Sequence, residues 1–332
     1  MDLHDVKKLA VIRLSSLGDI LLATPFIRSI KKSYPEIEIE FILKEQYKYL
    51  LLCNPYLSKI HAYKTDSPEY KSFLFDELKK EKFDLVIDLQ KNLRSGEIVR
   101  ALKTDTAAFN KRSIAKFLLV NFKINRLKNS PPIPVRYAES LDDFSLDNEG
   151  LDLYLPENVS SVLSSRENYI GLVPGSRHFT KMWPREYFIE LGIILTGEGF
   201  KIVLLGGESD KQICREISES VPRALNLCRG DNLFQTAADM KKCCALVCND
   251  SGLMHVGCAV KVPVLAVFGS TVKEFGFSPY GNKNLVLENN SLSCRPCSHV
   301  GRESCPKKHF KCMLDLKPAL AFDKLKILLN SR

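Results

Sequence analysis

Four stretches of the chain combine glycine with charged and hydroxyl side chains, a combination that suits phosphate and sugar groups. Glycine lets the backbone approach a ligand closely, lysine and arginine bind phosphate oxygens, and a carboxylate accepts a proton or holds a ribose hydroxyl. The stretches are SSLGD (15–19), PGSRHFTK (174–181), GGE (206–208) and NDSGLMH (249–255). Each stretch alone is ambiguous, but together they predict a site for sugar, ribose or phosphate groups.

The stretch 174–181 is the richest of the four in hydrogen-bond donors. Its hydroxyl and cationic side chains fall within six positions and belong to Ser176, Arg177, Thr180 and Lys181. They suit a phosphate or diphosphate because arginine offers a fork of donors and lysine a point charge. A solvated loop with ordinary basic residues is the alternative interpretation.

Two further stretches in the second half each have a functional and a structural interpretation. Glu208 could hold ribose hydroxyls, or it could be an acid favoured at a helix N-terminus. Asp250 and Ser251 can cap the next helix, while backbone N–H groups at Gly252 are open to an anion. His255, on the first turn of that helix, could donate to a phosphate or be a hydrogen-bonded core residue.

Asp19 stands where an apolar run ends and an amphipathic run begins. A carboxylate at the start of a helix caps free N–H groups, and a carboxylate in a ligand site can act as a general base. The two roles compete, because a side chain locked as a cap is a poorer base. Both interpretations of Asp19 are open at this point.

These stretches need a frame that brings them together, and the periodicity of the chain predicts one. Strands that alternate with helices indicate an α/β protein with two doubly wound parallel sheets in tandem. In the first half we expect strands at 9–14, 37–43, 60–63 and 84–89, and helices at 20–33, 46–52 and 70–80. In the second half we expect strands at 169–173, 201–205, 246–248 and 264–268, and helices at 184–197, 209–220, 253–258 and 318–329.

The expected domains are 1–165 and 166–315, followed by a C-terminal helix at 316–332 that could pack back on the first domain. The stretch NSPPIP (129–134) breaks the pattern, and little regular structure is expected from there to about residue 168. Ligands of such sheets bind beyond the carboxyl ends of the strands, so the loops directly after strands should face a central cleft. The G-x-G-x-x-G fingerprint and the Walker loop are both missing, which argues against a typical dehydrogenase or P-loop phosphotransferase.

Composition narrows the class of partner. The 332-residue chain has a net charge of +9, which favours an anionic partner. Nucleic acid is not expected, because no dense Lys/Arg block with interleaved aromatic residues is present. No signal peptide and no apolar run of about 20 residues is found, so we expect a cytoplasmic protein, peripheral on the inner face of the membrane.

Eleven cysteines in a chain of this kind do not predict a disulfide framework. Four of them, near the C-terminus, need separate treatment: Cys294, Cys297, Cys305 and Cys312. A C-x-x-C knuckle with two further thiols could bind a structural zinc ion. Redox pairs or unpaired thiols are the alternatives.

In their order and spacing, SSLGD, PGS…K-x-WP, LLGGE and NDSGLMH resemble the lipopolysaccharide heptosyltransferases of glycosyltransferase family 9. RYAESL (136–141) adds to this likeness. The family consists of inverting glycosyltransferases with the two-domain GT-B fold. The resemblance implies that the C-terminal domain binds an ADP-heptose donor and that Asp19 is the general base.

Further roles follow from the resemblance alone. Ser176 and Lys181 would contact the phosphates, with Arg177 and Thr180 beside them, and Glu208 would hold the ribose. Asp250, Ser251 and Gly252 would lie at the diphosphate and sugar, with His255 nearby. The acceptor would be an inner-core sugar on lipid A, either Kdo or a first heptose. Its contacts would come from Ser16, Gly18, Asn92, Arg94, Arg112 and Arg136, although solvated surface charge is the alternative for the basic ones.

The mechanism implied needs no metal. Lys181, Arg177 and the helix that opens at Gly252 would stabilise the leaving diphosphate, and no D-x-D pair is placed to hold a divalent ion. We therefore expect that catalysis requires no cofactor. We also expect the protein to be a monomer. A GT-B enzyme for another sugar or acceptor, or a protein that binds nucleotide-sugar or glycolipid without turnover, are the alternatives.

Overall fold

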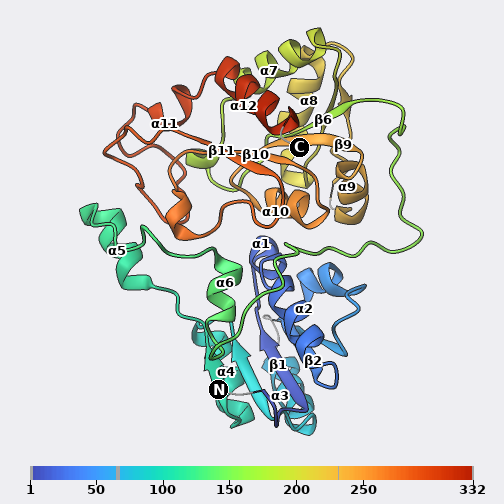
Figure 1. Cartoon of the computed structure of the whole chain (residues 1–332), viewed down its shortest axis with the longest axis vertical. Coiled ribbons are helices and arrows are strands. Elements are labelled where there is room, and N and C mark those ends of the chain that lie inside the picture. The colour runs from blue at the N-terminus through green and yellow to red at the C-terminus, as the bar shows by residue number, and fades with distance from the viewer. Residues whose placement is uncertain (1–2, 65–67, 231, 331–332) are drawn as a thin grey trace. The chain divides into compact units, whose positions relative to one another are not determined.

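The computed structural model describes residues 3–64, 68–230 and 232–330. The chain forms two compact units, each with its own parallel sheet (Figure 1). Unit 1 comprises Met1–Arg112 and Ile133–Tyr154, and unit 2 comprises Ser113–Pro132 and Leu155–Arg332. The chain therefore enters unit 2, returns to unit 1 and leaves it again, so each unit is described separately.

Unit 1 is a five-stranded parallel sheet with the strand order β3-β2-β1-β4-β5. The strands are β1 (Lys8–Ile12), β2 (Glu38–Lys44), β3 (Lys59–Tyr63), β4 (Leu85–Asp88) and β5 (Thr106–Ala108). The helices are α1 (Leu17–Leu21), α2 (Thr24–Ser33), α3 (Pro68–Lys80), α4 (Leu93–Leu102) and α6 (Ile133–Ala138), with a 3₁₀ turn η1 (Glu45–Leu51). Central β1 and β4 are buried almost throughout, as expected for parallel strands covered on both faces.

Unit 2 is a six-stranded parallel sheet with the order β11-β10-β9-β6-β7-β8. Its strands are β6 (Tyr169–Val173), β7 (Lys201–Leu204), β8 (Leu225–Asn226), β9 (Cys243–Asn249), β10 (Val264–Phe268) and β11 (Asn284–Glu288). Its helices are α5 (Ser113–Phe122), α7 (Arg185–Gly197), α8 (Lys211–Ser220), α9 (Leu233–Met240), α10 (Gly252–Ala259), α11 (Lys311–Leu314) and α12 (Pro318–Asn330). Three 3₁₀ turns complete it: η2 (Phe179–Lys181), η3 (Glu208–Asp210) and η4 (Lys273–Phe275). Within the described ranges, no helix combines the length and the apolarity that crossing a membrane requires.

The unit boundaries differ from the expected 1–165 and 166–315. Residues 113–132 fold with unit 2 because Leu119 and Leu127 form a small apolar cluster with Phe275. The C-terminal helix α12 also belongs to unit 2. It packs against α7 and β10, because Ala321 and Leu325 join the core of that unit. Of the two domains with which this helix could pack, it joins the second.

Several local elements also differ from expectation. The helix expected at 20–33 is two helices, α1 and α2, and Pro25 lies in the first turn of α2, where proline's missing N–H is tolerated. The stretch 46–52 is a 3₁₀ turn. The region from 129 to 168 is not wholly irregular, because it contains the buried helix α6.

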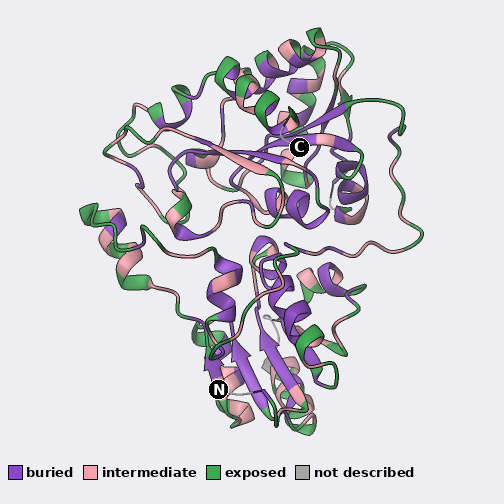
Figure 2. Ribbon diagram, in the orientation of Figure 1, coloured by how far each residue is buried: buried purple, intermediate pink, exposed green. Residues whose placement is uncertain are grey.

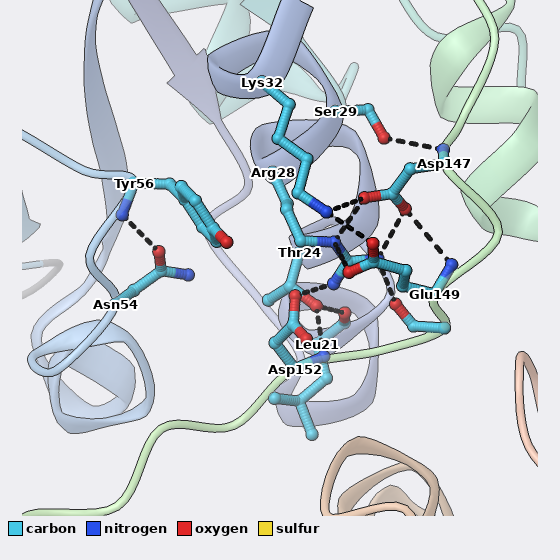
Figure 3. Close-up of polar contacts among 11 residues, drawn as sticks. Leu21, Thr24, Arg28, Ser29, Lys32, Asn54, Tyr56, Asp147, Glu149 and Asp152 are labelled. Atoms are coloured by element: carbon cyan, nitrogen blue, oxygen red, sulfur yellow. Dashed lines mark hydrogen bonds and ion pairs between the residues drawn. The ribbon is translucent and has the colours of Figure 1, made fainter. Parts of the chain in front are cut away.

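A buried arginine fastens the last segment of unit 1 to α2 (Figure 3). Arg28 is 1% exposed and donates from Nε and Nη2 to the carboxylate of Asp147, each at 2.7 Å. It also pairs with Asp152 and donates to the carbonyl oxygen of Gly150 at 2.8 Å. The hydroxyl of Thr24 accepts the N–H of Asp152 at 2.9 Å, which adds a second fastening. The guanidinium holds the pKa of Asp147 well below its usual range.

A second ionic network lies at the opposite end of the sheet, where β1 begins. Glu40, His61 and Glu81 bring ligand-type atoms within 4.8 Å of one another, which is the pattern of a candidate metal site. The Lys8 ammonium, however, lies 2.8 Å from Glu40 Oε1 and also pairs with Glu81. Lys59 pairs with Glu81 as well. We read this cluster as an internal ion network, because lysine already supplies its cations.

We expect Arg28→Met to destabilise the protein by about 3–5 kcal/mol, because Asp147 and Asp152 would keep their charge without a buried partner. Urea unfolding measures this. Lys32→Met is the control, since Lys32 reaches the same Asp147 carboxylate from a far more exposed position, and it should change the unfolding midpoint little. Equal losses in the two variants would contradict the buried-clamp interpretation.

The same cluster predicts a loss of stability in acid. A carboxylate whose pKa is lower in the folded than in the unfolded state stabilises the fold above its unfolded pKa of about 3.9. That contribution is lost as the pH falls towards the folded value. The native protein should therefore lose more stability below about pH 4 than Arg28→Met does, as measured by unfolding at a series of pH values.

Candidate active site

Both sheets reverse their strand order beside their first strand. In unit 1 the reversal lies between β1 and β4, and in unit 2 between β6 and β9. Ligands of open α/β sheets bind at such reversals, beyond the carboxyl ends of the strands. The loops after these four strands contain Asp19, Gln90, Lys181 and Asp250, so the topology brings predicted stretches together within each unit.

In unit 2 an ion pair joins the loops after β6 and β9. Lys181 Nζ lies 2.8 Å from Asp250 Oδ2, with the two side chains 15% and 7% exposed. Thr271, which follows β10, donates its hydroxyl to the same oxygen at 2.6 Å. Ser176 donates its hydroxyl to the carbonyl oxygen of Asp250 at 3.3 Å. Three strand-end loops thus meet at one carboxylate.

The backbone around this ion pair is fastened by buried hydrogen bonds. The Asn249 side chain donates to the carbonyl oxygen of Pro174 at 2.7 Å and accepts the N–H of Trp183 at 3.0 Å. Thr180 is predicted to lie beside the phosphates of the sugar donor. Instead, its side chain is buried, and its hydroxyl accepts the N–H of Arg302 at 2.8 Å. Thr180 therefore fixes Arg302 to this loop, and its hydroxyl is already engaged within the protein.

The start of α10 lies beside this cluster and offers further groups to an anion. Ser251 is the residue before the first turn, and its buried Oγ has no hydrogen-bond partner. Ser270, which precedes Thr271, also has a buried Oγ without a partner. Unpaired buried hydroxyls are costly, and a helix N-terminus attracts negative charge. His255 is buried on the first turn of α10.

The remaining unit 2 residues stand at the edge of this group. Arg177 is exposed, and together with burial and Lys181 it lowers the pKa of His178. Glu208, at the start of η3, is 59% exposed and pairs with Lys211 at 2.7 Å. Its position at the start of a 3₁₀ turn after β7 agrees with an N-terminal acid, and it is solvent-accessible for a ligand.

In unit 1, Asp19 does cap α1. Its Oδ2 accepts the N–H of Ser16 at 3.0 Å and the Ser16 hydroxyl at 2.8 Å, while Oδ1 pairs with Arg13. The Asp19 side chain keeps 17% of its surface exposed. Arg13 also donates to the carbonyl oxygen of Leu89 at 2.6 Å, which ties the loops after β1 and β4 together at the reversal.

The predicted acceptor residues are spread over several elements of unit 1. Gly18 is buried in α1. Asn92 caps α4 by accepting the N–H of Ser95 at 3.0 Å, and Arg94 is exposed on the same helix. Lys111, which the motifs did not single out, has its pKa lowered by burial and by Arg13.

Two arginines differ from simple surface charges. Arg112 pairs with Glu139 at 2.8 Å. Arg136 is only 1% exposed on α6, and burial together with the charge of Arg112 lowers its pKa to about 10. The alternative of a solvated surface charge is therefore wrong for Arg136.

The four C-terminal cysteines are free thiols. Cys294 Sγ lies 3.8 Å from His309 Nε2, and burial raises the pKa of Cys312 to about 11. Among the described residues, one group of three possible metal ligands has its ligand atoms within 4.8 Å of one another, namely Glu40, His61 and Glu81. The four cysteines do not form such a group in this structure. Zinc at the cysteines stays a prediction.

Sequence reasoning assigned no role to three residues that organise the site: Arg13, Thr271 and Asn249, although Asn249 opens the predicted stretch 249–255. Arg13 directly follows β1, Asn249 is the last residue of β9, and Thr271 lies three positions after the end of β10. Closeness to a strand end is the signal that could have found them. Thr271 ends the run Gly269-Ser-Thr after β10, a pattern of the same kind as the stretches that were recognised.

Comparison with known proteins identifies the family. Residues 73–308 match the family model "Glycosyltransferase family 9 (heptosyltransferase)". Lipooligosaccharide heptosyltransferase 2 of Campylobacter jejuni is 27% identical over 327 residues, which cover 95% of this chain and 96% of that protein. This relative is similar along nearly its whole length.

Solved structures share the fold. A family 9 glycosyltransferase from Veillonella parvula superposes with a TM-score of 0.78 at 23% identity, covering 97% of both chains. The E. coli heptosyltransferase WaaC with ADP-2-deoxy-2-fluoro heptose gives 0.70 at 17% identity, covering 96% of this chain and 99% of that one. The expected fold class, two Rossmann-like domains of the GT-B type, is thereby confirmed.

We expect Lys181→Met to lower stability by about 3 kcal/mol, because it leaves the buried Asp250 carboxylate without its cation. Adding Asp250→Asn to the same chain should recover most of the loss, since the amide can still accept the Thr271 hydroxyl. Thermal unfolding of the single and double variants measures the coupling. A strictly additive double variant would show that the pair is not coupled.

Proposed function

From the premise that the chain belongs to glycosyltransferase family 9, the heptosyltransferases, we propose that it transfers heptose from ADP-heptose to the inner core of lipopolysaccharide. The acceptor is Kdo or a first heptose carried on lipid A. The carrying observation is the Lys181–Asp250–Thr271 cluster, which fixes a cation at the strand reversal of unit 2. The names of relatives that act on lipopolysaccharide or lipooligosaccharide agree with this acceptor.

Unit 2 binds the donor in this proposal. The complex of the E. coli heptosyltransferase with a fluorinated ADP-heptose supports the nucleotide sugar as ligand of this fold. Lys181, Arg177 and the N-terminus of α10 supply positive charge for the diphosphate. Ser251 and Ser270 have buried hydroxyls without partners, and a phosphate or sugar oxygen would satisfy them. Glu208 holds the ribose.

Asp250 acts mainly on Lys181. Its Oδ2 carries the contacts with Lys181 and Thr271, which leaves Oδ1 for a hydroxyl of the donor sugar. A carboxylate pressed directly against a diphosphate would repel it. We therefore assign Asp250 to positioning the lysine and Lys181 to stabilising the leaving ADP.

Asp19 takes the proton of the attacking acceptor hydroxyl. A carboxylate has about four lone-pair positions, two on each oxygen. Oδ2 uses both of its positions on Ser16, whereas Oδ1 pairs with Arg13 and keeps one position for a proton. Capping and base catalysis are therefore compatible in Asp19, because they use different oxygens.

The acceptor binds to unit 1, where Arg94, Arg112 and Lys111 supply positive charge. No metal or other cofactor enters the proposed reaction, because cationic side chains already meet the developing negative charge. The protein acts in the cytoplasm at the inner face of the membrane, where a lipid-anchored acceptor is available. Attack opposite the departing diphosphate inverts the anomeric centre.

The function is tested by incubating the purified protein with ADP-heptose and either Kdo-lipid A or its mono-heptosylated form. We expect one acceptor to gain the mass of a single heptose, with equal yield in the presence of EDTA. The folded but cation-depleted Lys181→Met/Asp250→Asn variant is the negative control. No mass gain on either acceptor would contradict the substrate pair, and loss of activity in EDTA would contradict a metal-free reaction.

Two substitutions separate the roles of Asp19. Asp19→Asn keeps an oxygen for the N–H of Ser16 but cannot take a proton, whereas Asp19→Ala removes both the cap and the base. We expect kcat to fall about 10²–10⁴-fold in both variants, with unchanged affinity for ADP by calorimetry. If Asp19→Asn keeps near-native turnover while Asp19→Ala does not, the residue serves only as a cap.

A further inference from the structure

The segment 113–132 presents an apolar and basic surface that the proposed reaction does not use. Helix α5 and the turn after it expose four large apolar side chains: Ile114 (77%), Phe117 (57%), Phe122 (62%) and Ile124 (49%). Figure 2 colours much of α5 as exposed. Single exposed apolar residues are ordinary, whereas four within eleven positions form a continuous feature of one short segment.

The two faces of α5 explain why these side chains stay outside. Ala115 and Leu119, one turn apart, pack with Phe275 in the small apolar cluster of unit 2. Ile114 and Phe117, three positions apart, share a different face. The rings of Phe117 and Phe122 lie edge to face with centroids 5.9 Å apart. The outer surface is therefore preorganised by its own contacts.

The charge of this segment has one sign. Residues 106–138 contain seven Lys or Arg and no Asp or Glu, against a net charge of +9 for the chain. Four of the cations lie within 113–132: Lys116, Lys123, Arg126 and Lys128. Arg126 and Lys128 are exposed, and the Lys123 ammonium donates to the carbonyl oxygens of Cys294 and Pro296. An acid from elsewhere in unit 2, Glu274, accepts a hydrogen bond from the side-chain amide of Asn125 at 3.4 Å.

We propose that the segment 113–132, through Ile114, Phe117, Phe122 and Ile124 with Arg126 and Lys128, docks the protein on a membrane surface rich in acidic phospholipid. Apolar side chains on an interfacial helix enter the boundary between headgroups and acyl chains, and basic side chains remain at the phosphates. Docking on an uncharged membrane would not explain why residues 106–138 contain no acid. Docking on a protein partner would not require 33 consecutive residues to carry charge of one sign only. Docking would bring the enzyme to its lipid-anchored acceptor, and this purpose rests on the proposed function. The proposal that the segment binds acidic membranes does not depend on that function.

Vesicle co-sedimentation tests the proposal without any acceptor or nucleotide. We expect binding to phosphatidylcholine vesicles that contain roughly one-third phosphatidylglycerol, and little binding to phosphatidylcholine alone. Phe117→Ser and Phe122→Ser should each weaken partitioning about tenfold. Arg126→Gln and Lys128→Gln should each weaken it about fivefold, with the loss confined to low and moderate salt.

Phe73→Ser is the matched control, because Phe73 is 59% exposed on α3, a helix that carries as many acids as lysines. It should bind vesicles as the native protein does, and circular dichroism should show that all variants remain folded. Absence of native binding to the acidic vesicles, or an equal loss in Phe73→Ser, would overturn the proposal. So would a dimer that Phe117→Ser disperses while vesicle binding persists, since a second copy would then be the occupant. Failure of the heptose-transfer assay with intact vesicle binding would reject the proposed function and leave this surface in place.

Discussion

The reversal of strand order beside the first strand of each sheet is the constraint from which the polar cluster of each unit follows. Parallel strands end at one edge, and crossovers to opposite faces separate the loops on either side of the reversal. In unit 2 this constraint brings Lys181, Asp250 and Thr271 to one point although 90 residues separate the first from the last. In unit 1 it brings Arg13 to the loop after β4. No local signal in the chain could draw such distant residues together without the sheet.

Charge is buried at these strand ends, as it also is at Arg28 and Glu40. The desolvation cost of a buried ion is met where a loop or a neighbouring strand supplies a partner and several hydrogen bonds. Asp250 and Asp19 illustrate two solutions. Asp250 is held by a cation and a hydroxyl on one oxygen, whereas Asp19 divides a cap and an ion pair between two oxygens. In the proposed function part of each carboxylate serves a ligand, whereas the Arg28 cluster fastens a segment of unit 1.

The sequence predicts the α/β class, most of the central strands and the four strand-end stretches, because apolar runs and glycine-rich joints are local signals. It does not predict that the Thr180 hydroxyl is hydrogen-bonded to Arg302 or that Arg136 is buried, since both depend on segments far away in the chain. The unit boundaries fail for the same reason. Residues 113–132 join unit 2 through Leu119, Leu127 and Phe275, contacts that span about half the chain. Roles in binding and catalysis came from the family resemblance rather than from residue patterns.

Residues 113–132 fold with unit 2, and packing within that unit does not explain why their outer face is apolar. Two additional chain crossings fix a segment whose buried anchor is a cluster of only three residues and their partly buried neighbours. A helix that served folding alone would gain from polar residues on its outer face, because exposed phenylalanine and isoleucine favour aggregation. Here the outer face is apolar, and the segment itself contains four cations and no acid. Folding stability therefore does not explain the composition of α5, whereas contact with an acidic lipid surface explains both its apolar and its basic residues.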